Sequence, residues 1–244
     1  MWQTFFRIYN FFCGFIPNSA RRANIRKKRL YDWAKKYTAL RRACPELKFR
    51  NVKMIKGGWN IGFIVDKKYV FKIRKFFDDE NHPVKKIMRE KRITDAFGNI
   101  VPLKIPRIDI VESDGYTFYR YNFIPGRNMN TFPLRTVKKY ESKWGKQIAQ
   151  FIYKMHNSNP IGIDDLRDCD GDGWNHHDIC NNVIVNPKTM EIIGLIDWEY
   201  AGWGPLETEF INCTLFSKKF RKTNLDKIIR NEYKKLANKK VRKH

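Results

Sequence analysis

Residues 174–185 read WNHHDICNNVIV and end in an apolar run that predicts a short strand over Val183–Val185. Asp178 is followed shortly by Asn182, so a carboxylate base stands beside an amide that can bind a metal ion. A second apolar run, Ile192–Ile196, is followed directly by Asp197, and an acid in that position is costly to bury without a cation. Asn182 and Asp197 together could therefore hold Mg²⁺ through oxygen ligands, with the remaining positions left to phosphate and water.

Two features upstream of this segment fit phosphate binding. Residues 57–62 read GGWNIG, and Gly57 and Gly58 would let backbone N–H groups approach phosphate oxygens, although an ordinary hairpin turn explains the same letters. Lys72 stands among apolar neighbours on the next predicted strand, where an inward lysine needs an anionic partner. Glu90, on the following predicted helix, could be that partner and fix the lysine head on a phosphate. A surface lysine on an edge strand is the plainer interpretation.

The order of the predicted elements indicates an α+β fold of two lobes. A β-rich front with one main helix ends at Pro125-Gly126, and a mostly helical back follows. We expect a basic helical extension over residues 1–50, an N-lobe over 51–126 and a C-lobe over 127–244. The expected strands are 51–56, 62–65, 69–74, 107–111, 116–124, 183–185 and 192–196, and the expected helices are 29–43, 83–97, 134–157 and 207–237.

The positive charge of the chain lies at its two ends. The 244 residues carry a formal net charge of +24, of which residues 1–50 hold +11 and residues 218–244 hold +10, so +3 remains for 51–217. An enzyme of nucleic acid usually lines its working groove with positive charge. The nearly neutral middle, which carries the motifs, therefore argues against nucleic acid as the partner. Hydrophobic residues at 42% exclude disorder as the main state, and a mean hydropathy of −0.61 excludes a polytopic membrane protein.

The first 29 residues combine an aromatic helical face with a basic cluster. Apolar residues recur every three or four positions from Trp2 to Ile16, and six Lys or Arg residues follow between Arg21 and Arg29. This pattern fits a peripheral contact with an anionic membrane surface, or a helix packed on the protein's own core. The run is too short to span a membrane and lacks the features of a signal peptide. Five cysteines without a CxxC pair indicate neither disulfides nor a zinc site. We expect a cytoplasmic protein, with a peripheral position at the inner membrane face as a further hypothesis.

The motifs, in this order, resemble the aminoglycoside phosphotransferase and choline kinase group within the protein-kinase-like fold. The resemblance covers residues 51–213 and is most specific at His176-x-Asp178 and at Ile196-Asp197-Trp198-Glu199. It implies ATP-dependent phosphorylation of a hydroxyl, with a nucleotide-binding N-lobe and a catalytic C-lobe. The roles that it implies are a catalytic base at Asp178, Mg²⁺ ligands at Asn182 and Asp197, a phosphate-binding Lys72 oriented by Glu90, an adenine-facing hinge that includes Tyr121 and Phe123, and a structural His176 that ties the catalytic loop to the Asp197 segment.

One departure from that group concerns the catalytic loop. The group usually places four residues between the Asp and the Asn, whereas only Ile179-Cys180-Asn181 separate Asp178 from Asn182. Either the loop is one residue tighter, or Asn181 and Asn182 divide the role differently. A pseudokinase scaffold with basic arms that bind lipid or nucleic acid is the non-enzyme alternative, although the acidic groups needed for catalysis are all present.

The motifs leave the acceptor open. A small molecule or glycan is the leading hypothesis, and a lipopolysaccharide-core or other surface-glycan sugar would suit a basic N-terminus at a membrane. Choline or another amino alcohol is the alternative, because Trp198, Tyr200 and Trp203 with Glu199 could surround an ammonium group, although core packing also explains these aromatic residues. An aminoglycoside is the third hypothesis: the acidic loop at 164–172 could receive a polycation, but the basic ends would repel it.

Overall fold

The computed structural model describes residues 33–56, 60–74, 83–215 and 217–241. The predictions for Gly57 and Gly58 and for the aromatic and basic segment at residues 1–29 lie outside this part of the chain. The described residues divide into two compact units, residues 33–50 with 111–118 and residues 51–110 with 119–241. The predicted boundary between two lobes near residue 126 falls inside the second unit and stays a prediction.

The first unit consists of a helix and the tip of a β-hairpin. The helix occupies residues 33–43, within the predicted range of 29–43, and ends just before Cys44-Pro45. Arg42 Nη1 donates to Asp114 Oδ2 at 2.8 Å and so joins the helix to the hairpin turn. Asp114 and Gly115 have φ values of 52° and 73°, the left-handed conformation that a tight hairpin turn requires.

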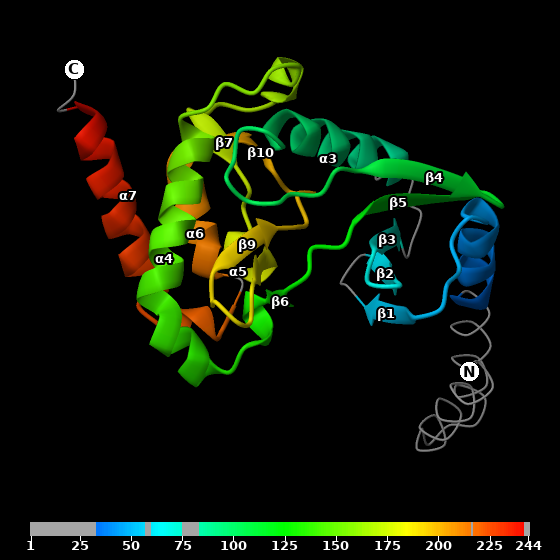
Figure 1. The fold of residues 1–244 in the computed structure, drawn as a ribbon. Helices are drawn as coiled ribbons and strands as arrows, with labels where there is room; N and C mark the ends of the chain where they lie inside the picture. Colours follow the sequence, from blue (N-terminus) through cyan, green and yellow to red (C-terminus); the bar gives the residue numbers. More distant parts are fainter. Residues whose placement is uncertain (1–32, 57–59, 75–82, 216, 242–244) are drawn as a thin grey trace, which may run out of the picture. The chain divides into compact units, whose positions relative to one another are not determined.

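The second unit begins with a sheet whose strand order is β1-β2-β3-β5-β4 (Figure 1). Alternating buried residues such as Phe71 and Ile73 put one face of β3 into the core, as expected for a half-buried strand. The five predicted strands are confirmed, and β4 lies two residues further along the chain than predicted. The strands are β1 (Val52–Lys56), β2 (Asn60–Val65), β3 (Tyr69–Arg74), β4 (Asp109–Ser113) and β5 (Tyr116–Asn122).

Helix α3 (Pro83–Phe97) has the predicted bounds. It begins at a proline, which is favoured at the first helical position because its missing N–H has no partner to lose there. Ile87, Ile93 and Phe97 are buried on one face, and Glu90 is buried with them. Met88 is apolar as well but is 42% exposed. A helix turns about 100° per residue, so Met88 is rotated away from Ile87 and toward solvent.

The remainder of the second unit is mostly helical. The predicted helix over 207–237 is in fact two helices, because the chain leaves helical geometry between residues 217 and 224. Glu141 fixes this interruption by accepting from Asn224 N at 2.9 Å and from Asn224 Nδ2 at 3.2 Å. The helices are α4 (Leu134–His156), α5 (Ile179–Asn182), α6 (Leu206–Leu215) and α7 (Leu225–Val241), with short 3₁₀ turns at Met129–Thr131, Asp164–Leu166 and Phe220–Lys222. The short strands are β6 (Arg127–Asn128), β7 (Gly173–Asn175), β8 (Val183–Val185), β9 (Ile192–Leu195) and β10 (Gly202–Gly204).

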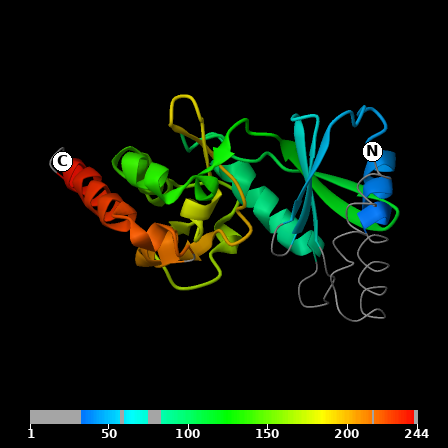
Figure 2. The same cartoon turned by 90° about the horizontal axis from the view of Figure 1, so that it is seen from below.

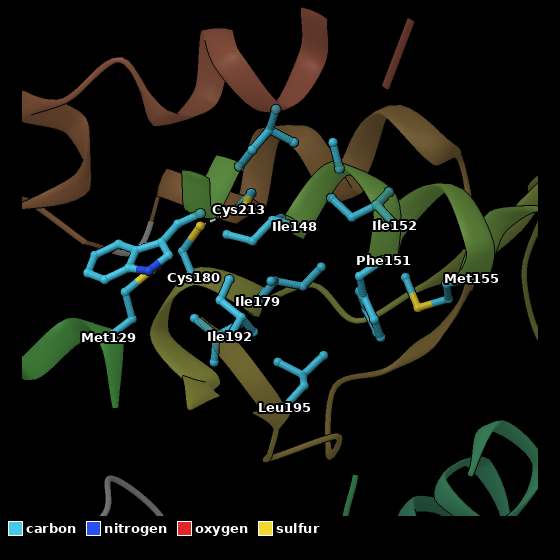
Figure 3. Packing of buried hydrophobic residues seen from close by; sticks show 14 of the residues in the cluster. Met129, Ile148, Phe151, Ile152, Met155, Ile179, Cys180, Ile192, Leu195 and Cys213 are labelled. Carbon is cyan, nitrogen blue, oxygen red and sulfur yellow. Dashed lines mark hydrogen bonds between the residues drawn. The ribbon is translucent and has the colours of Figure 1, made fainter. Parts of the chain in front are cut away.

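The main core lies around α4 and includes residues of α5 and β9 (Figure 3). The predicted helix over 134–157 is confirmed as α4, and its apolar face is buried through Trp144, Ile148, Phe151, Ile152 and Met155. Each such side chain contributes about 1.5–3 kcal/mol by leaving water. The face packs on Ile179 and Cys180 of α5 and on Ile192 and Leu195 of β9, so the residues around Asp178 and Asp197 stand on a rigid base.

Helices α4 and α7 lie side by side in both ribbon views (Figures 1 and 2). Gly145 of α4 makes this close approach feasible, because a Cβ atom there would lie 2.6 Å from Ile228 Cγ2 of α7. No helix among the described residues combines the length and the apolar character that a membrane span requires.

Candidate active site

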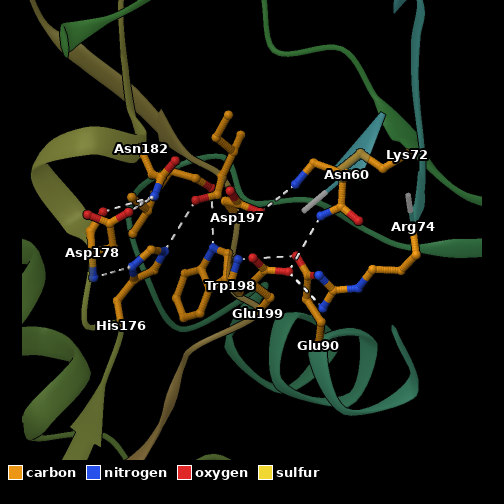
Figure 4. A network of polar contacts seen from close by, with 12 residues as sticks. Asn60, Lys72, Arg74, Glu90, His176, Asp178, Asn182, Asp197, Trp198 and Glu199 are labelled. Carbon is orange, nitrogen blue, oxygen red and sulfur yellow. Dashed lines mark hydrogen bonds and ion pairs between the residues drawn. The ribbon is translucent and has the colours of Figure 1, made fainter. Parts of the chain in front are cut away.

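The catalytic segment is a single helical turn between two short strands. The chain leaves β7, passes His176–Asp178, forms α5 and enters β8. Asn181 Nδ2 donates to Asp178 Oδ1 at 2.7 Å, and Asn182 Nδ2 donates to Asp178 Oδ2 at 2.9 Å and to Asp178 O at 3.0 Å (Figure 4). The two amides are three and four residues beyond Asp178, the separations at which side chains on a helical turn meet. The short spacing therefore brings two amides to one carboxylate.

Two opposing effects act on the pKa of the Asp178 carboxylate. Burial raises its pKa above the ordinary value, whereas the N–H donors of Asn181 and Asn182 act to lower it. Its backbone N–H donates to His176 Nδ1 at 3.3 Å, so His176 fixes the backbone of Asp178 while the two amides hold its carboxylate.

His176 is fully buried and links the two halves of the site. Burial lowers its pKa to about 4, so the ring is neutral at pH 7. Because Nδ1 accepts from Asp178 N, the ring proton is assigned to Nε2, which donates to Ile196 O at 3.2 Å. The ring also packs edge-on against Trp198, with centroids 4.9 Å apart. The prediction that His176 ties the catalytic loop to the Asp197 segment is confirmed.

Lys72 of β3 forms an ion pair with Asp197 rather than with Glu90. Lys72 Nζ donates to Asp197 Oδ1 at 2.5 Å, and the attraction to this lysine lowers the pKa of Asp197 (Figure 4). The expected direct pairing of Lys72 with Glu90 is corrected here, because Glu90 Oε1 instead accepts from Trp198 N at 3.1 Å. Burial raises the pKa of Glu90 to about 7. Glu90 thus holds the backbone just after Asp197.

Asp197 itself has a φ of 65°, a left-handed conformation that costs about 1–3 kcal/mol for a residue other than glycine. The surrounding contacts, with Lys72 on its carboxylate and Trp198 N on Glu90, hold the backbone in this state. Strain of this kind occurs where a side chain must be aimed, and here it aims the Asp197 carboxylate at Lys72.

Asn182 and Asp197 are neighbours in space, as a shared metal ion would require. Ile196 N donates to Asn182 O at 3.2 Å, which places the two segments side by side. Among the described residues, no group of three or more His, Cys, Asp or Glu side chains is arranged to hold a metal ion. One carboxylate and one amide fit Mg²⁺, which is usually bound through one or two carboxylates together with phosphates and water. The residues thus fit a Mg²⁺–nucleotide complex.

Arg74 was missed in the sequence and lies two residues beyond Lys72, on the same face of β3. Its Nη2 is 3.0 Å from Glu199 Oε2, and both side chains are nearly buried. Asn60 Nδ2 of β2 lies 3.5 Å from the same oxygen. The period-two pattern of the strand could have identified Arg74, but nothing local indicates its partner Glu199.

The predicted hinge residues lie on β5 and just beyond it. The Tyr121 ring centroid is 5.9 Å from Lys72 Nζ, and the ring of Tyr119, which the sequence analysis did not single out, is 5.4 Å from the same atom. Phe123 N donates to Lys68 O at 2.7 Å, and its ring packs in the apolar cluster that contains both tyrosines. The adenine-facing role of Tyr121 and Phe123 stays a prediction.

Glu209 of α6 was also missed, and it supports the catalytic loop from beneath. This fully buried carboxylate accepts through Oε2 from His176 N and, at 3.1 Å, from His177 N. Burial raises its pKa to about 7. His177 has a φ of 69°, so these two hydrogen bonds stabilise an unusual backbone conformation directly before Asp178. An acid 31 residues along the chain from Asp178 leaves no local signal of this contact.

Two of the three aromatic residues proposed for a cage are covered by the protein, whereas Tyr200 is exposed. Trp198 is fully buried and packs against Phe97 and Phe151, so core packing accounts for it. The ring of Trp203 has the Arg167 guanidinium 4.3 Å from its centroid. Glu199 is already paired with Arg74.

The acidic loop is largely neutralised by arginines and by a helix terminus. Asp164 pairs with Arg167 at 3.0 Å, Asp165 with Arg92 at 2.6 Å and Asp168 with Arg89 at 3.7 Å. Asp172 Oδ1 accepts from Leu206 N at 2.9 Å, which caps the start of α6. Four carboxylates that were considered as acceptors of a polycation therefore have partners within the protein.

Comparison with known proteins agrees with this geometry. Residues 163–235 match the sequence model of the phosphotransferase enzyme family APH. Those residues include Asp178, Asn182 and Asp197. No curated protein matches the chain.

Several solved structures share the fold at low sequence identity. A ternary complex of APH(2″)-IIa with streptomycin and ATP is 15% identical with a TM-score of 0.58, and the match covers 82% of each chain. The GDP complex of aminoglycoside 2′-phosphotransferase-IIIa is 15% identical with a TM-score of 0.59, over 82% of this chain and 86% of that one. Macrolide 2′-phosphotransferase MphH from Brachybacterium faecium is 11% identical with a TM-score of 0.55, over 81% of this chain and 82% of that one.

The expected fold class is therefore confirmed. The chain has the protein-kinase-like α+β fold of the aminoglycoside phosphotransferases, and its residues 163–235 match the sequence pattern of the phosphotransferase enzyme family.

Proposed function

We propose that this protein is a kinase that transfers the γ-phosphoryl group of ATP to a hydroxyl of a small molecule or glycan. One observation carries the proposal: the fold brings Lys72, Asp197, Asn182 and Asp178 together from separate segments, through the 2.5 Å pair of Lys72 with Asp197 and the hydrogen bond from Ile196 N to Asn182 O. Phosphoryl transfer depends on positioning and charge neutralisation, and this set of residues can supply both.

The proposed roles follow from where each side chain lies. Asn182 and Asp197 would hold Mg²⁺, which when bound neutralises charge on the phosphate oxygens. Lys72 would bind the α- and β-phosphates. Asp178 would accept the proton of the acceptor hydroxyl while the new O–P bond forms and the bond from the γ-phosphorus to its bridging oxygen breaks, which yields ADP and a phosphate ester.

A sugar hydroxyl is the acceptor that the surroundings favour over a cationic one. Of the aromatic residues proposed for a choline cage, Trp198 is buried and Trp203 is covered by Arg167, which leaves only Tyr200 exposed, and Glu199 is engaged by Arg74. Three of the loop acids proposed for an aminoglycoside, Asp164, Asp165 and Asp168, are paired with arginines, and Asp172 accepts from Leu206 N. A neutral or acidic sugar, such as one of a lipopolysaccharide core or another surface glycan, needs neither an ammonium cage nor an open acidic surface.

We further propose a peripheral position at the inner face of a membrane. Residues 1–29 supply an aromatic and basic segment, and the described part of α7 adds exposed lysines at positions 227, 234, 235 and 239. Lysines close to an anionic bilayer each contribute about 1 kcal/mol to binding. Deletion of residues 1–29 should reduce sedimentation with phosphatidylglycerol vesicles, and unchanged sedimentation would reject the role of that segment.

The central test has a binding step and a transfer step. Mg²⁺ with ATP should raise the thermal unfolding temperature, with Mg²⁺–GTP as the comparison, and Asp197→Ala should abolish the rise. A phosphate-transfer screen against sugars, amino alcohols and aminoglycosides should then yield a product that Asp178→Asn does not form. Absence of nucleotide stabilisation in the unaltered protein would overturn the kinase proposal and favour a non-catalytic scaffold.

A further inference from the structure

The two consecutive asparagines of the catalytic loop have different surroundings. Both donate to the Asp178 carboxylate, Asn181 to Oδ1 at 2.7 Å and Asn182 to Oδ2 at 2.9 Å. Their backbone carbonyls point to different neighbours. Asn182 O accepts from Ile196 N, beside Asp197, whereas Asn181 O accepts from Asn128 Nδ2 of β6 at 2.6 Å. The backbone of Asn182 is thus bound to the segment that carries Asp197, whereas the backbone of Asn181 is bound to β6.

The amide oxygen of Asn181 is not open to a metal ion. Asn181 Oδ1 is completely covered by protein and has no hydrogen-bond partner among the described residues. A covered oxygen cannot bind a metal ion that also has to bind phosphate and water. The orientation of the Asn181 amide is held by the hydrogen bond that its Nδ2 makes to Asp178 Oδ1.

We propose that Asn181 and Asn182 divide one role in two: Asn181 positions the Asp178 carboxylate, and Asn182 contributes to Mg²⁺ binding. The cause is the tightened loop. With three intervening residues, positions three and four beyond Asp178 both face it on the turn of α5, so a second amide can clamp the base. With four intervening residues, the metal-binding Asn would be five positions away and outside this contact. Asn181 is therefore a positioning residue. This inference rests on the proposed kinase function.

The test compares Asn181→Ala with Asn182→Ala in the full-length protein. Asn181→Ala should lower kcat by about 10- to 100-fold, because a hydrogen bond to a charged group contributes about 1.5–3 kcal/mol. It should leave the KM for ATP, the Mg²⁺ concentration at half-saturation and the thermal stabilisation by Mg²⁺–ATP within twofold of the unaltered protein. Asn182→Ala should instead raise the Mg²⁺ requirement at least about tenfold and weaken the Mg²⁺–ATP stabilisation.

Two controls separate positioning from folding. Asn181→Leu keeps about the size of the side chain and adds no charge but removes the N–H donor, so it should reproduce the loss of kcat. Asn186→Ala, in the turn after β8, removes a turn-forming asparagine outside the site and should leave kcat unchanged. The nucleotide stabilisation is measured without turnover and reports binding by itself.

Each outcome has a distinct meaning. If the unaltered protein transfers phosphate and Asn181→Ala has the same kcat, the positioning role is wrong while the kinase function stands. If Asn181→Ala raises the Mg²⁺ requirement as Asn182→Ala does, the division of roles is wrong. If the unaltered protein neither transfers phosphate nor is stabilised by Mg²⁺–ATP, the proposed function fails, and this inference fails with it.

Discussion

Replacement of Glu209 by glutamine should change how the stability of the protein depends on pH. Burial raises the pKa of Glu209 from 4.5 to about 7. Between these values the folded protein keeps a proton that the unfolded chain has lost, so unfolding releases it. The free energy of unfolding of the unaltered protein therefore falls as the pH rises through this range. The side chain introduced by Glu209→Gln does not titrate, and its amide oxygen can still accept from His176 N and His177 N.

The magnitude follows from the size of the shift. A difference of 2.5 in pKa corresponds to about 3.4 kcal/mol at 1.36 kcal/mol per unit. The contribution of Glu209 to the free energy of unfolding should therefore fall by about 2–3 kcal/mol between pH 5 and pH 8. The free energy of unfolding of Glu209→Gln should thus rise by this amount relative to that of the unaltered protein as the pH rises, and the difference should level off above pH 7. His156 and His176, whose pKa values burial lowers to about 4, act in the opposite direction but are present in both proteins and cancel.

Urea unfolding followed by tryptophan fluorescence, at half-unit steps from pH 5 to pH 8, measures the two free energies. A difference between the two proteins that is constant across this range would refute the buried, proton-retaining Glu209. If the variant instead gains stability relative to the unaltered protein as the pH falls, the carboxylate is stabilised in its ionised form, contrary to its burial.

Three other substitutions test the supporting structure. Gly171→Ala should destabilise the protein by at least about 2 kcal/mol in urea unfolding, because its Cβ would lie 2.3 Å from the backbone of Gly204; a loss below 0.5 kcal/mol would contradict that packing. Arg74→Gln should lower the free energy of unfolding by about 3–5 kcal/mol, because it leaves the Glu199 carboxylate buried without its cationic partner. The double variant with Glu199→Gln should recover part of this loss. If the effects of the two substitutions simply add, the ion pair is excluded. Lys72→Ala should abolish thermal stabilisation by Mg²⁺–ATP. The control is Lys188→Ala, which replaces an exposed lysine in the β8–β9 turn and should retain the stabilisation. Equal stabilisation of the two variants would argue against Lys72 as the phosphate-binding lysine.

Local patterns predicted the regular elements well. The bounds of α3 and β8 and the buried face of α4 follow from apolar periodicity and from proline and glycine positions, which act within one segment. The split of the predicted helix at 207–237 could not be predicted in this way. It depends on Glu141 of α4, which binds Asn224 from more than 80 residues away.

The residues of the candidate site also fall into those that local sequence patterns identified and those that they missed. Asp178, Asn182 and Asp197 stand at the ends of short apolar runs, and acids and amides in those positions indicate chemistry because they are costly to bury. Arg74 escaped notice because lysines and arginines are abundant in this chain. Glu209 escaped because its significance depends on which backbone N–H groups lie above it.

The sequence by itself determined the reaction class to expect, since the catalytic motifs are local and their order along the chain is distinctive. Only the tertiary structure decided the partners. Lys72 pairs with Asp197 and not with Glu90, the loop acids are taken up by arginines, and two asparagines hold one carboxylate. The physical reason is that a charged or polar side chain is paired by whatever group lies within about 3 Å after folding, and that distance is set by packing of segments far apart in the chain.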